Sequence, residues 1–331
     1  MSDIADTPDL TIGIPTINRL DYLKECFLSC VNQKWPDNKK IEIIISNNSS
    51  NDGTEEFLNN IVKSYAGGTV SVKVLHQSTV IPMIENWNAC LTESKGSYFL
   101  LLSDDDVLCE GFSDGLFRDD VTSHKNIAGI LTGFDVIDGA GCEIRTSKNK
   151  SGLYSGREFY KKLVVRELRY VFCGFIFKTD ILKGGQVFER EFEKGMMADG
   201  AAIMNSAVNG DILVLEEKLV QYRVHDNNNS KYPDIKLNIR TREFFIDYSK
   251  TLENKWADVC DWTVYWCLDG YFYQAGHWVL KKKITSVEIR TLISDMNEKL
   301  MSHEMKSISL YRRLMLKSKK MIMLASSFLI K

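Results

Sequence analysis

Apolar and polar positions along the first hundred residues alternate between two patterns, one typical of strands and one of helices. Four short apolar or alternating segments predict strands: 10–15, 41–46, 70–75 and 98–103. Three stretches with helical spacing lie between them: about 20–33, a stretch from about 54, and 84–94. This order predicts an α/β fold with a doubly wound, mostly parallel sheet flanked by helices, whose ligands bind at the carboxyl ends of the strands.

The remainder of the chain divides at about residue 231. Before that point the pattern predicts four further elements: a helix over 113–123, a strand over 127–132, a hairpin turn over 138–141 and a buried strand over 170–177. After it, apolar and aromatic residues recur every three or four positions, which is typical of packed helices. We therefore predict one domain over 1–231 and a helical C-terminal region over 232–331.

Three consecutive aspartates, Asp104–Asp106, directly follow the apolar segment 98–103. Carboxylates this close repel one another, and no basic residue lies within several positions in the sequence. Either they are solvated in a turn, or a cation that is not part of the chain lies there. An isolated acidic run is most simply a helix N-terminus, where the dipole favours negative charge. At the end of a central strand, a divalent cation that bridges carboxylates to a substrate's phosphates is favoured instead.

Polar turns follow the first two predicted strands. They read IPTINR over 14–19 and SNNSSNDGT over 46–54, and their short side chains can bond a base or a ribose. Neither turn contains the glycine pattern of a dinucleotide-binding fold or of a phosphate-binding P-loop.

Charge is distributed unevenly along a chain whose formal net charge is −2. Residues 281–331 contain twelve Lys or Arg against four Asp or Glu, which leaves about −10 for the residues before them. An acidic body argues against nucleic acid as a partner, because nucleic-acid-binding proteins place basic residues on the working surface.

Three further features predict a cytosolic protein. The eight cysteines include no CxxC pair, so they are better read as small core residues than as a disulfide framework or a zinc site. The first ten residues are polar and acidic, unlike a signal peptide. No apolar run reaches the roughly 20 residues that a membrane span requires.

Four motifs in order resemble those of the family 2 glycosyltransferases with the GT-A fold, and in particular bacterial enzymes of O-antigen and capsular polysaccharide synthesis. They are LTIGIPTINRLDYLKECFLSCVNQ, IEIIISNNSSNDGT, NACLTESKGSYFLLLSDDDVL and YRVHDNNNS. The resemblance spans roughly residues 10–230. It implies an inverting transferase that uses a nucleotide-sugar donor and a divalent metal, Mn²⁺ or Mg²⁺.

The resemblance also assigns roles to single residues. The implied donor-binding residues are Pro15, Thr16, Asn18, Asn47, Asp104 and Asp105. The DxD element maps onto Asp104–Asp106, with Asp106 as the foremost metal ligand and Asp105 facing the ribose. Two positions depart from the family: Asn47 replaces an aspartate that contacts the base, and Trp87 replaces an arginine that often precedes the helix asparagine, here Asn88.

Asp199 and His225 complete the predicted chemistry. The resemblance nominates Asp199 as the general base that takes the proton of the acceptor hydroxyl; its sequence alone suits a helix N-cap equally well. His225 follows an alternating strand, and a neutral imidazole is a competent Mn²⁺ ligand, although a lone histidine is more often structural. We predict metal ligands Asp104, Asp106 and His225.

The C-terminal segment 310–330 interleaves basic residues with leucines and methionines. It suits either a helix packed on the body or a helix that lies on an anionic membrane surface, and we favour the membrane. A lipid-linked oligosaccharide acceptor would agree with such a location on the inner face of the plasma membrane.

These features predict a metal-dependent inverting glycosyltransferase that moves a sugar from a nucleotide-sugar donor to a glycan acceptor. A nucleotidyltransferase, which would release pyrophosphate, is one alternative. A non-catalytic protein that binds a nucleotide sugar or acts as a scaffold is another, and Asn47 and Trp87 keep it open.

Overall fold

The chain forms two compact units, each described by itself. The first unit is Met1–Arg190 with Ala202–Asn228, and the second is Glu191–Ala201 with Asn229–Lys331. The predicted division at residue 231 places Glu191–Ala201 in the first domain, whereas this segment belongs to the second unit. The computed structural model describes residues 7–65, 68–124, 127–185, 188–225, 234–280, 285, 287–288, 290–291, 293–294 and 305–327.

A ten-stranded sheet forms the centre of the first unit. Its strand order is β3-β2-β1-β4-β9-β6-β10-β5, with β7 added on β6 and β8 on β10. The strands are β1 Leu10–Thr16, β2 Ile41–Asn47, β3 Val70–His76, β4 Tyr98–Leu101, β5 Val107–Leu108, β6 Ile127–Asp138, β7 Glu143–Thr146, β8 Gly152–Tyr154, β9 Phe175–Lys178 and β10 Asp211–Val224.

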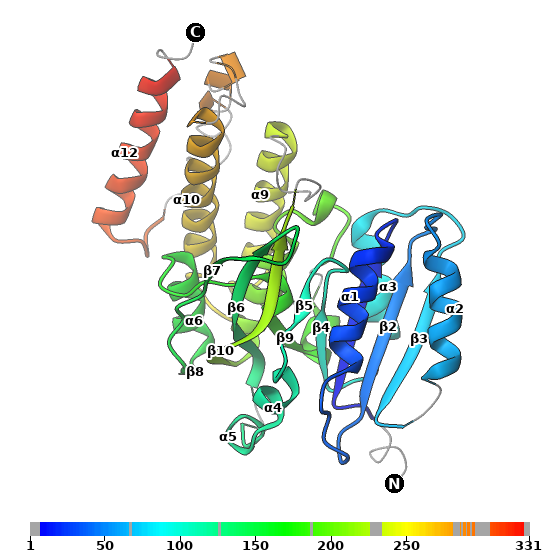
Figure 1. Ribbon diagram of the computed structural model, residues 1–331. Helices are drawn as coiled ribbons and strands as arrows, with labels where there is room; N and C mark the ends of the chain where they lie inside the picture. Colours follow the sequence, from blue (N-terminus) through cyan, green and yellow to red (C-terminus); the bar gives the residue numbers. More distant parts are fainter. Residues whose placement is uncertain are drawn as a thin grey trace. The chain divides into compact units, whose positions relative to one another are not determined.

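The strands β3, β2, β1 and β4 run parallel at one side of this sheet (Figure 1). β1 and β2 are buried along their whole length, as expected for central strands covered on both faces. β3 is the edge strand, and its partly exposed side chains agree with the alternation in its sequence. Thr16 of β1 pairs with Asn47 of β2, so the two strands end at the same level.

The other half of the sheet is mixed. β9 runs antiparallel to both β4 and β6, and β6 and β10 are parallel to each other. Among the described strands, the two-residue strand β5 pairs with β10 alone, in antiparallel orientation. This pairing brings the chain just after Asp104–Asp106 against the end of β10.

Helices α1, α2 and α3 connect the parallel strands. Because such crossovers are right-handed, α1 and α2 cover one face, and α3, which returns to β4 on the other side of β1, covers the opposite face. Figure 1 shows α1 in front of these strands and α3 behind them. The helical segments of the first unit are α1 Leu20–Val31, α2 Thr54–Ser64, α3 Met83–Glu93, α4 Phe112–Phe117, α5 Asp119–Thr122, α6 Gly156–Val164, η2 Phe172–Gly174 and α7 Thr179–Gly184.

The second unit is helical. It contains the short turn η3 Glu193–Gly195 and the helices α9 Ile235–Lys250, α10 Val259–Leu280 and α12 Leu310–Ser327, while α8 Ala198–Asn209 begins in it and ends in the first unit. The guanidinium of Arg242 on α9 donates to the carbonyl of Cys267 on α10 at 3.1 Å. No helix in the described parts of the chain combines the length and apolar character that a membrane crossing needs.

The predicted fold class is confirmed, including the helical C-terminal region. Two element predictions are wrong in detail. The helix expected over 113–123 is interrupted at Arg118, whose backbone is extended and whose side chain pairs with Asp120 and Glu217. The strand expected over 170–177 begins only at Phe175, because the preceding residues form the turn η2.

Candidate functional site

The predicted ligand-binding turns meet at the carboxyl ends of β1, β2 and β4. Pro15 and Thr16 are buried within β1, and Asn47 is buried at the end of β2. The chain leaving β4 leads directly into the three aspartates. In an open α/β sheet this edge, on both sides of the point where the strand order reverses, is where ligands bind.

Hydrogen bonds join the turns after β1 and β2 to each other. The backbone N–H of Asn18 donates to Ser50 Oγ at 3.0 Å, and Asn18 Oδ1 accepts from the N–H of Asn51 at 2.8 Å. Asn18 has a φ of 51°, an uncommon conformation that these bonds hold in place. Asn47 Oδ1 accepts from the N–H of Ser50 at 3.1 Å. Two amides predicted to bind the donor therefore also shape the loops.

Asp52 ties the same two turns to the helices that follow them. Its Oδ2 accepts from the N–H of Leu20, the first residue of α1, at 2.9 Å. Its Oδ1 accepts from the N–H and the hydroxyl of Thr54, the first residue of α2, at 3.2 and 2.6 Å. One carboxylate thus satisfies backbone donors at the N-termini of two helices.

The aspartates are buried, and side chains of the protein itself contact Asp104 and Asp105. Asp104, Asp105 and Asp106 are 4%, 5% and 2% exposed. Arg19 Nη1 donates to Asp104 Oδ1 at 3.1 Å and to Asp105 Oδ2 at 2.9 Å. His225 Nε2 lies 2.8 Å from the same oxygen of Asp105. From the sequence we expect solvation or an external cation at the aspartates. The structure shows instead contacts to Arg19 and His225.

Arg223 of β10 donates hydrogen bonds to the aspartate turn. Its backbone N–H donates to Asp106 Oδ1 at 2.9 Å, and its Nε donates to the carbonyl of Asp105 at 2.8 Å. Its Nη2 lies 2.7 Å from Glu25 Oε1 of α1, and its guanidinium lies over the ring of Tyr22. Tyr22 also stacks on the imidazole of His225, with ring centroids 5.2 Å apart.

Burial changes the acidity of these groups. Desolvation raises the pKa of Asp104 to about 6, although Arg19 opposes the shift. Burial also holds the pKa of Asp106 well above its ordinary value, and Asp105 adds to the rise. Burial lowers the pKa of Arg19, but Asp104 and Asp105 outweigh it and the pKa is raised. Burial therefore shifts both Asp104 and Asp106 toward their neutral forms.

The predicted metal ligands lie in one cluster, but not as a coordination set. Asp104 accepts from Arg19, Asp106 accepts from Arg223, and His225 contacts Asp105. Over the residues that the structure describes, no three or more His, Cys, Asp or Glu side chains are arranged to hold a metal ion. The types of donor, carboxylate oxygens and an imidazole, are those that Mn²⁺ accepts.

Asp199 belongs to the second unit and lies in the first turn of α8. Its Oδ1 accepts from the N–H of Gly200 at 2.7 Å. Since the first and second units are described separately, its assignment as the general base stays a prediction.

Trp87 and Asn88, at the departure from the family pattern, take part in packing within the first unit. The indole of Trp87 packs against Phe172 and Phe188, with ring centroids 5.3 and 5.7 Å apart. The amide of Asn88 donates to the carbonyl of Phe188 at 2.7 Å. Phe172 immediately precedes Cys173, whose thiol interacts with the Asp106 carboxyl, so this aromatic cluster borders the aspartates.

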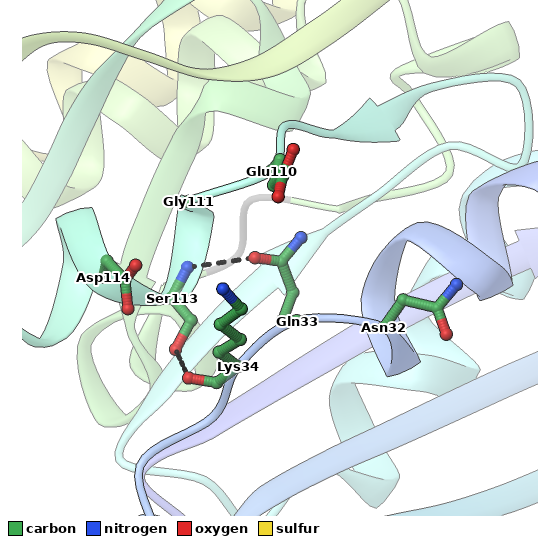
Figure 2. Close-up of a pocket in the computed structure, with 7 residues that line it drawn as sticks. All are labelled: Asn32, Gln33, Lys34, Glu110, Gly111, Ser113 and Asp114. Carbon is green, nitrogen blue, oxygen red and sulfur yellow. Dashed lines mark hydrogen bonds between the residues drawn. The ribbon is translucent and has the colours of Figure 1, made fainter.

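A small cavity of about 120 Å³ lies elsewhere in the first unit, between the end of α1 and the start of α4 (Figure 2). The side chain of Gln33 accepts from the N–H of Ser113 at 3.2 Å and donates to the carbonyls of Ser29 and Cys109, both at 2.9 Å. None of the predicted site residues lines this cavity. The lining residues are Asn32, Gln33, Lys34, Glu110, Gly111, Ser113 and Asp114. The hydrogen bonds of Gln33 in this cavity join α1 to the segment that leads into α4.

Comparison with known proteins identifies the family of the domain that contains these turns and aspartates. Residues 11–114, which contain both polar turns and the aspartates, match Glycosyl transferase family 2. These residues form a family 2 glycosyltransferase domain. The resemblance inferred from the sequence motifs is thereby confirmed.

Two curated bacterial glycosyltransferases are similar to the chain. Over 192 residues it is 26% identical to GalNAc(5)-diNAcBac-PP-undecaprenol beta-1,3-glucosyltransferase of Campylobacter jejuni, with 56% of each protein covered. Over 101 residues it is 33% identical to abequosyltransferase RfbV of Salmonella typhimurium, with 30% of this chain and 29% of the relative covered. The matched stretches thus span about half, or less, of the relatives' length.

Solved structures show the same fold around the family 2 glycosyltransferase domain. Residues 1-349 of TarS from S. aureus, in complex with UDP-GlcNAc, superpose with a TM-score of 0.69 at 16% identity, covering 96% of this chain and 89% of that one. The same TarS fragment in another crystal structure gives a TM-score of 0.66 at 14% identity. At these identities the likeness shows the fold.

Three residues of the family 2 glycosyltransferase domain and its neighbouring strand were not assigned a role from the sequence: Arg19, Tyr22 and Arg223. Arg19 lies in the turn after the first strand, Tyr22 lies in the first turn of α1, and Arg223 lies in the motif YRVH. Their nearness in the sequence to strand ends with predicted site residues is a signal that could have identified them.

Proposed function

We propose that this protein is an inverting glycosyltransferase that moves a sugar from a nucleotide-sugar donor to a glycan acceptor, in the synthesis of a bacterial surface polysaccharide such as O-antigen or capsule. The family match over residues 11–114, with the buried aspartates at the end of β4, carries this proposal. The activities named for the Campylobacter and Salmonella relatives support it. The UDP-GlcNAc complex of TarS supports a nucleotide-sugar donor.

The donor would bind across the carboxyl ends of β1, β2 and β4. Pro15, Thr16 and Asn47 line the ends of the first two strands, where base and ribose would lie. The aspartates lie beyond them, where the diphosphate would lie. An amide at Asn47 both donates and accepts, whereas a carboxylate only accepts, so the base contact differs in kind from that of a family member with aspartate.

A divalent cation, Mn²⁺ or Mg²⁺, belongs to this proposal. Asp104, Asp106 and His225 would hold it, since their oxygen and imidazole donors fit such a cation. When bound, the cation would neutralise the negative charge that develops on the leaving diphosphate.

Asp199 would supply the base. In an inverting transfer the acceptor hydroxyl attacks the anomeric carbon, the bond to the diphosphate breaks, and the hydroxyl proton must be taken up. A positioned carboxylate can accept that proton as the bond forms. Asp199 then carries the proton while the nucleoside diphosphate leaves as an anion.

The acceptor is proposed to be lipid-linked, and the enzyme to lie on an anionic membrane surface through α12. One face of α12 packs within the second unit, with Leu316 and Met323 buried and Lys319 paired with Asp269. The opposite face carries apolar side chains that are 41% to 71% exposed: Leu310, Tyr311, Leu314, Met315, Met321 and Ile322. Basic residues beside an exposed apolar stripe suit a membrane whose surface is negative.

A donor screen tests the proposed function. The full-length protein would be incubated with Mn²⁺ and a set of radiolabelled nucleotide sugars, and the products separated. Release of a nucleoside diphosphate from one donor is the expected result. In a parallel incubation with nucleoside triphosphates and sugar phosphates, release of pyrophosphate would indicate a nucleotidyltransferase. Binding without turnover of any donor would indicate a non-catalytic protein.

A further inference from the structure

Arg19 and Arg223, the two arginines that contact the aspartate turn, differ in the burial of their side chains. Arg223 is 2% exposed, and its side chain contacts three carbonyl groups and the carboxylate of Glu25. Its contacts come from α1, from the aspartate turn and from the turn after β6. Moving this guanidinium would break all of them, so Arg223 is a fixed part of the fold.

Arg19 is placed differently. Its side chain is 27% exposed, whereas the side chains of the carboxylates it bridges, Asp104 and Asp105, are 5% and 6% exposed. A molecule that approaches the carboxylates from solvent therefore meets Arg19. The backbone on either side is held by the bonds of Asn18 to the second turn and of Leu20 to Asp52, so a change of partner at Arg19 would take place in its side chain.

We propose that Arg19 is the resident cation of this site, which neutralises Asp104 and Asp105 before the donor binds and turns to the donor's diphosphate when a divalent cation takes its place. A guanidinium suits both partners, because its planar donors match carboxylates and phosphates equally. This inference rests on the proposed function for the nature of the cation and of the diphosphate.

The exchange makes cation binding depend on the diphosphate. A divalent cation that arrives alone must displace Arg19, or bind beside its positive charge, and Arg19 receives no new partner. A cation that arrives with a diphosphate supplies that partner. Arg19 therefore couples the two ligands and disfavours a metal site filled without donor.

Manganese binding measured without any sugar nucleotide tests this coupling. Free Mn²⁺ would be followed by electron paramagnetic resonance during titration of the full-length protein, with and without inorganic pyrophosphate as a base-free diphosphate. The variants are Arg19→Gln, Arg19→Lys and, as a charge-matched control on α1, Lys24→Gln. Circular dichroism would confirm that each variant is folded.

Arg19→Gln should bind Mn²⁺ alone roughly 5- to 20-fold more tightly than wild type, and pyrophosphate should then raise that affinity less than in wild type. Arg19→Lys, which keeps the charge, and Lys24→Gln should bind Mn²⁺ alone as wild type does. Unchanged or weaker Mn²⁺ binding by Arg19→Gln, or no Mn²⁺ binding by any of the proteins, would overturn the inference.

The proposed function fails separately. If wild type turns over a nucleotide sugar while Arg19→Gln binds Mn²⁺ as wild type does, only the role of Arg19 is wrong. If Arg19→Gln shows the expected tighter binding while no donor is turned over, only the proposed function is wrong.

Discussion

Replacing Asp52 by alanine should destabilise the first unit measurably, although the residue is exposed. The carboxylate accepts three hydrogen bonds, from the N–H of Leu20 and from the N–H and hydroxyl of Thr54. Alanine leaves the backbone donors at the starts of α1 and α2 to water alone.

The size of the effect follows from the two helix starts. Losing one capping side chain lowers the free energy of unfolding by about 0.5–2 kcal/mol. Because Asp52 bonds to the N-termini of two helices but is exposed, we expect Asp52→Ala to lower it by about 1–3 kcal/mol. For a unit of this size the loss corresponds to a fall in Tm of roughly 2–10 °C. Asp52→Asn keeps one acceptor oxygen and should lose about half as much.

Acid supplies a second measurement of the same interaction. Burial is the largest single influence on Asp52 and raises its pKa, but the hydrogen bonds from Thr54 and Leu20 together outweigh it, and the pKa lies below its ordinary value. A carboxyl with a lowered folded pKa stabilises the fold above its unfolded pKa of about 4, and this contribution is lost as the pH falls through the folded pKa. The Tm difference between wild type and Asp52→Ala should therefore be constant near pH 7 and shrink below pH 4.

Thermal unfolding followed by circular dichroism, at several pH values, would measure both effects. Glu55→Ala, in the first turn of α2, is the control for loss of an acidic side chain at the same helix end. If Asp52→Ala unfolds within 1 °C of wild type at pH 7, the reasoning from the double cap is wrong.

Three further predictions concern chemistry and location. Asp199→Asn should lower kcat by about 10²–10⁴ while donor affinity stays as in wild type, and near-normal kcat in a folded variant would remove the base assignment. Asp106→Ala should lose Mn²⁺-dependent binding of nucleoside diphosphate in calorimetry; wild-type affinity would contradict its role as a ligand. Leu314→Glu with Ile322→Glu should release the protein from anionic liposomes in a sedimentation assay while turnover on a water-soluble acceptor continues, and retained sedimentation would argue against the exposed face of α12.

Much of the fold could be predicted from the sequence because its signals are local. The strands β1, β2 and β4 are continuous apolar runs that end in polar turns, and α1, α2 and α3 have helical spacing between them. The failures arise where tertiary contacts override the pattern. Arg118 interrupts the helix expected over 113–123 because its side chain reaches a carboxylate on β10, 99 residues away.

The aspartates follow a strand end, as the sequence predicts, but their side-chain partners could not be predicted from the sequence. The apolar segment 98–103 predicts a strand that ends at the aspartates, but the sequence near them contains no basic residue. The side chains that contact them lie far along the chain: Arg19 is 85 residues from Asp104, and His225 is 120 residues from Asp105. Such pairs depend on strand order, which one sequence without its structure does not reveal.

The pairing of β5 with β10 has a consequence for the order of assembly. The parallel strands β1 to β4 pair with one another within residues 10–101, over short lengths of chain, and β4 gains its second neighbour, β9, only later. Arg19 can pair with Asp104 and Asp105 early, but Asp106 acquires its bond only when β10 is made, because its partner Arg223 lies 117 residues later. Closing so long a loop is entropically costly and slow. During synthesis, we expect the nucleotide-side turns to form on the growing chain well before the acidic turn acquires its native partners. An incomplete chain would thus hold a folded scaffold without a finished diphosphate site.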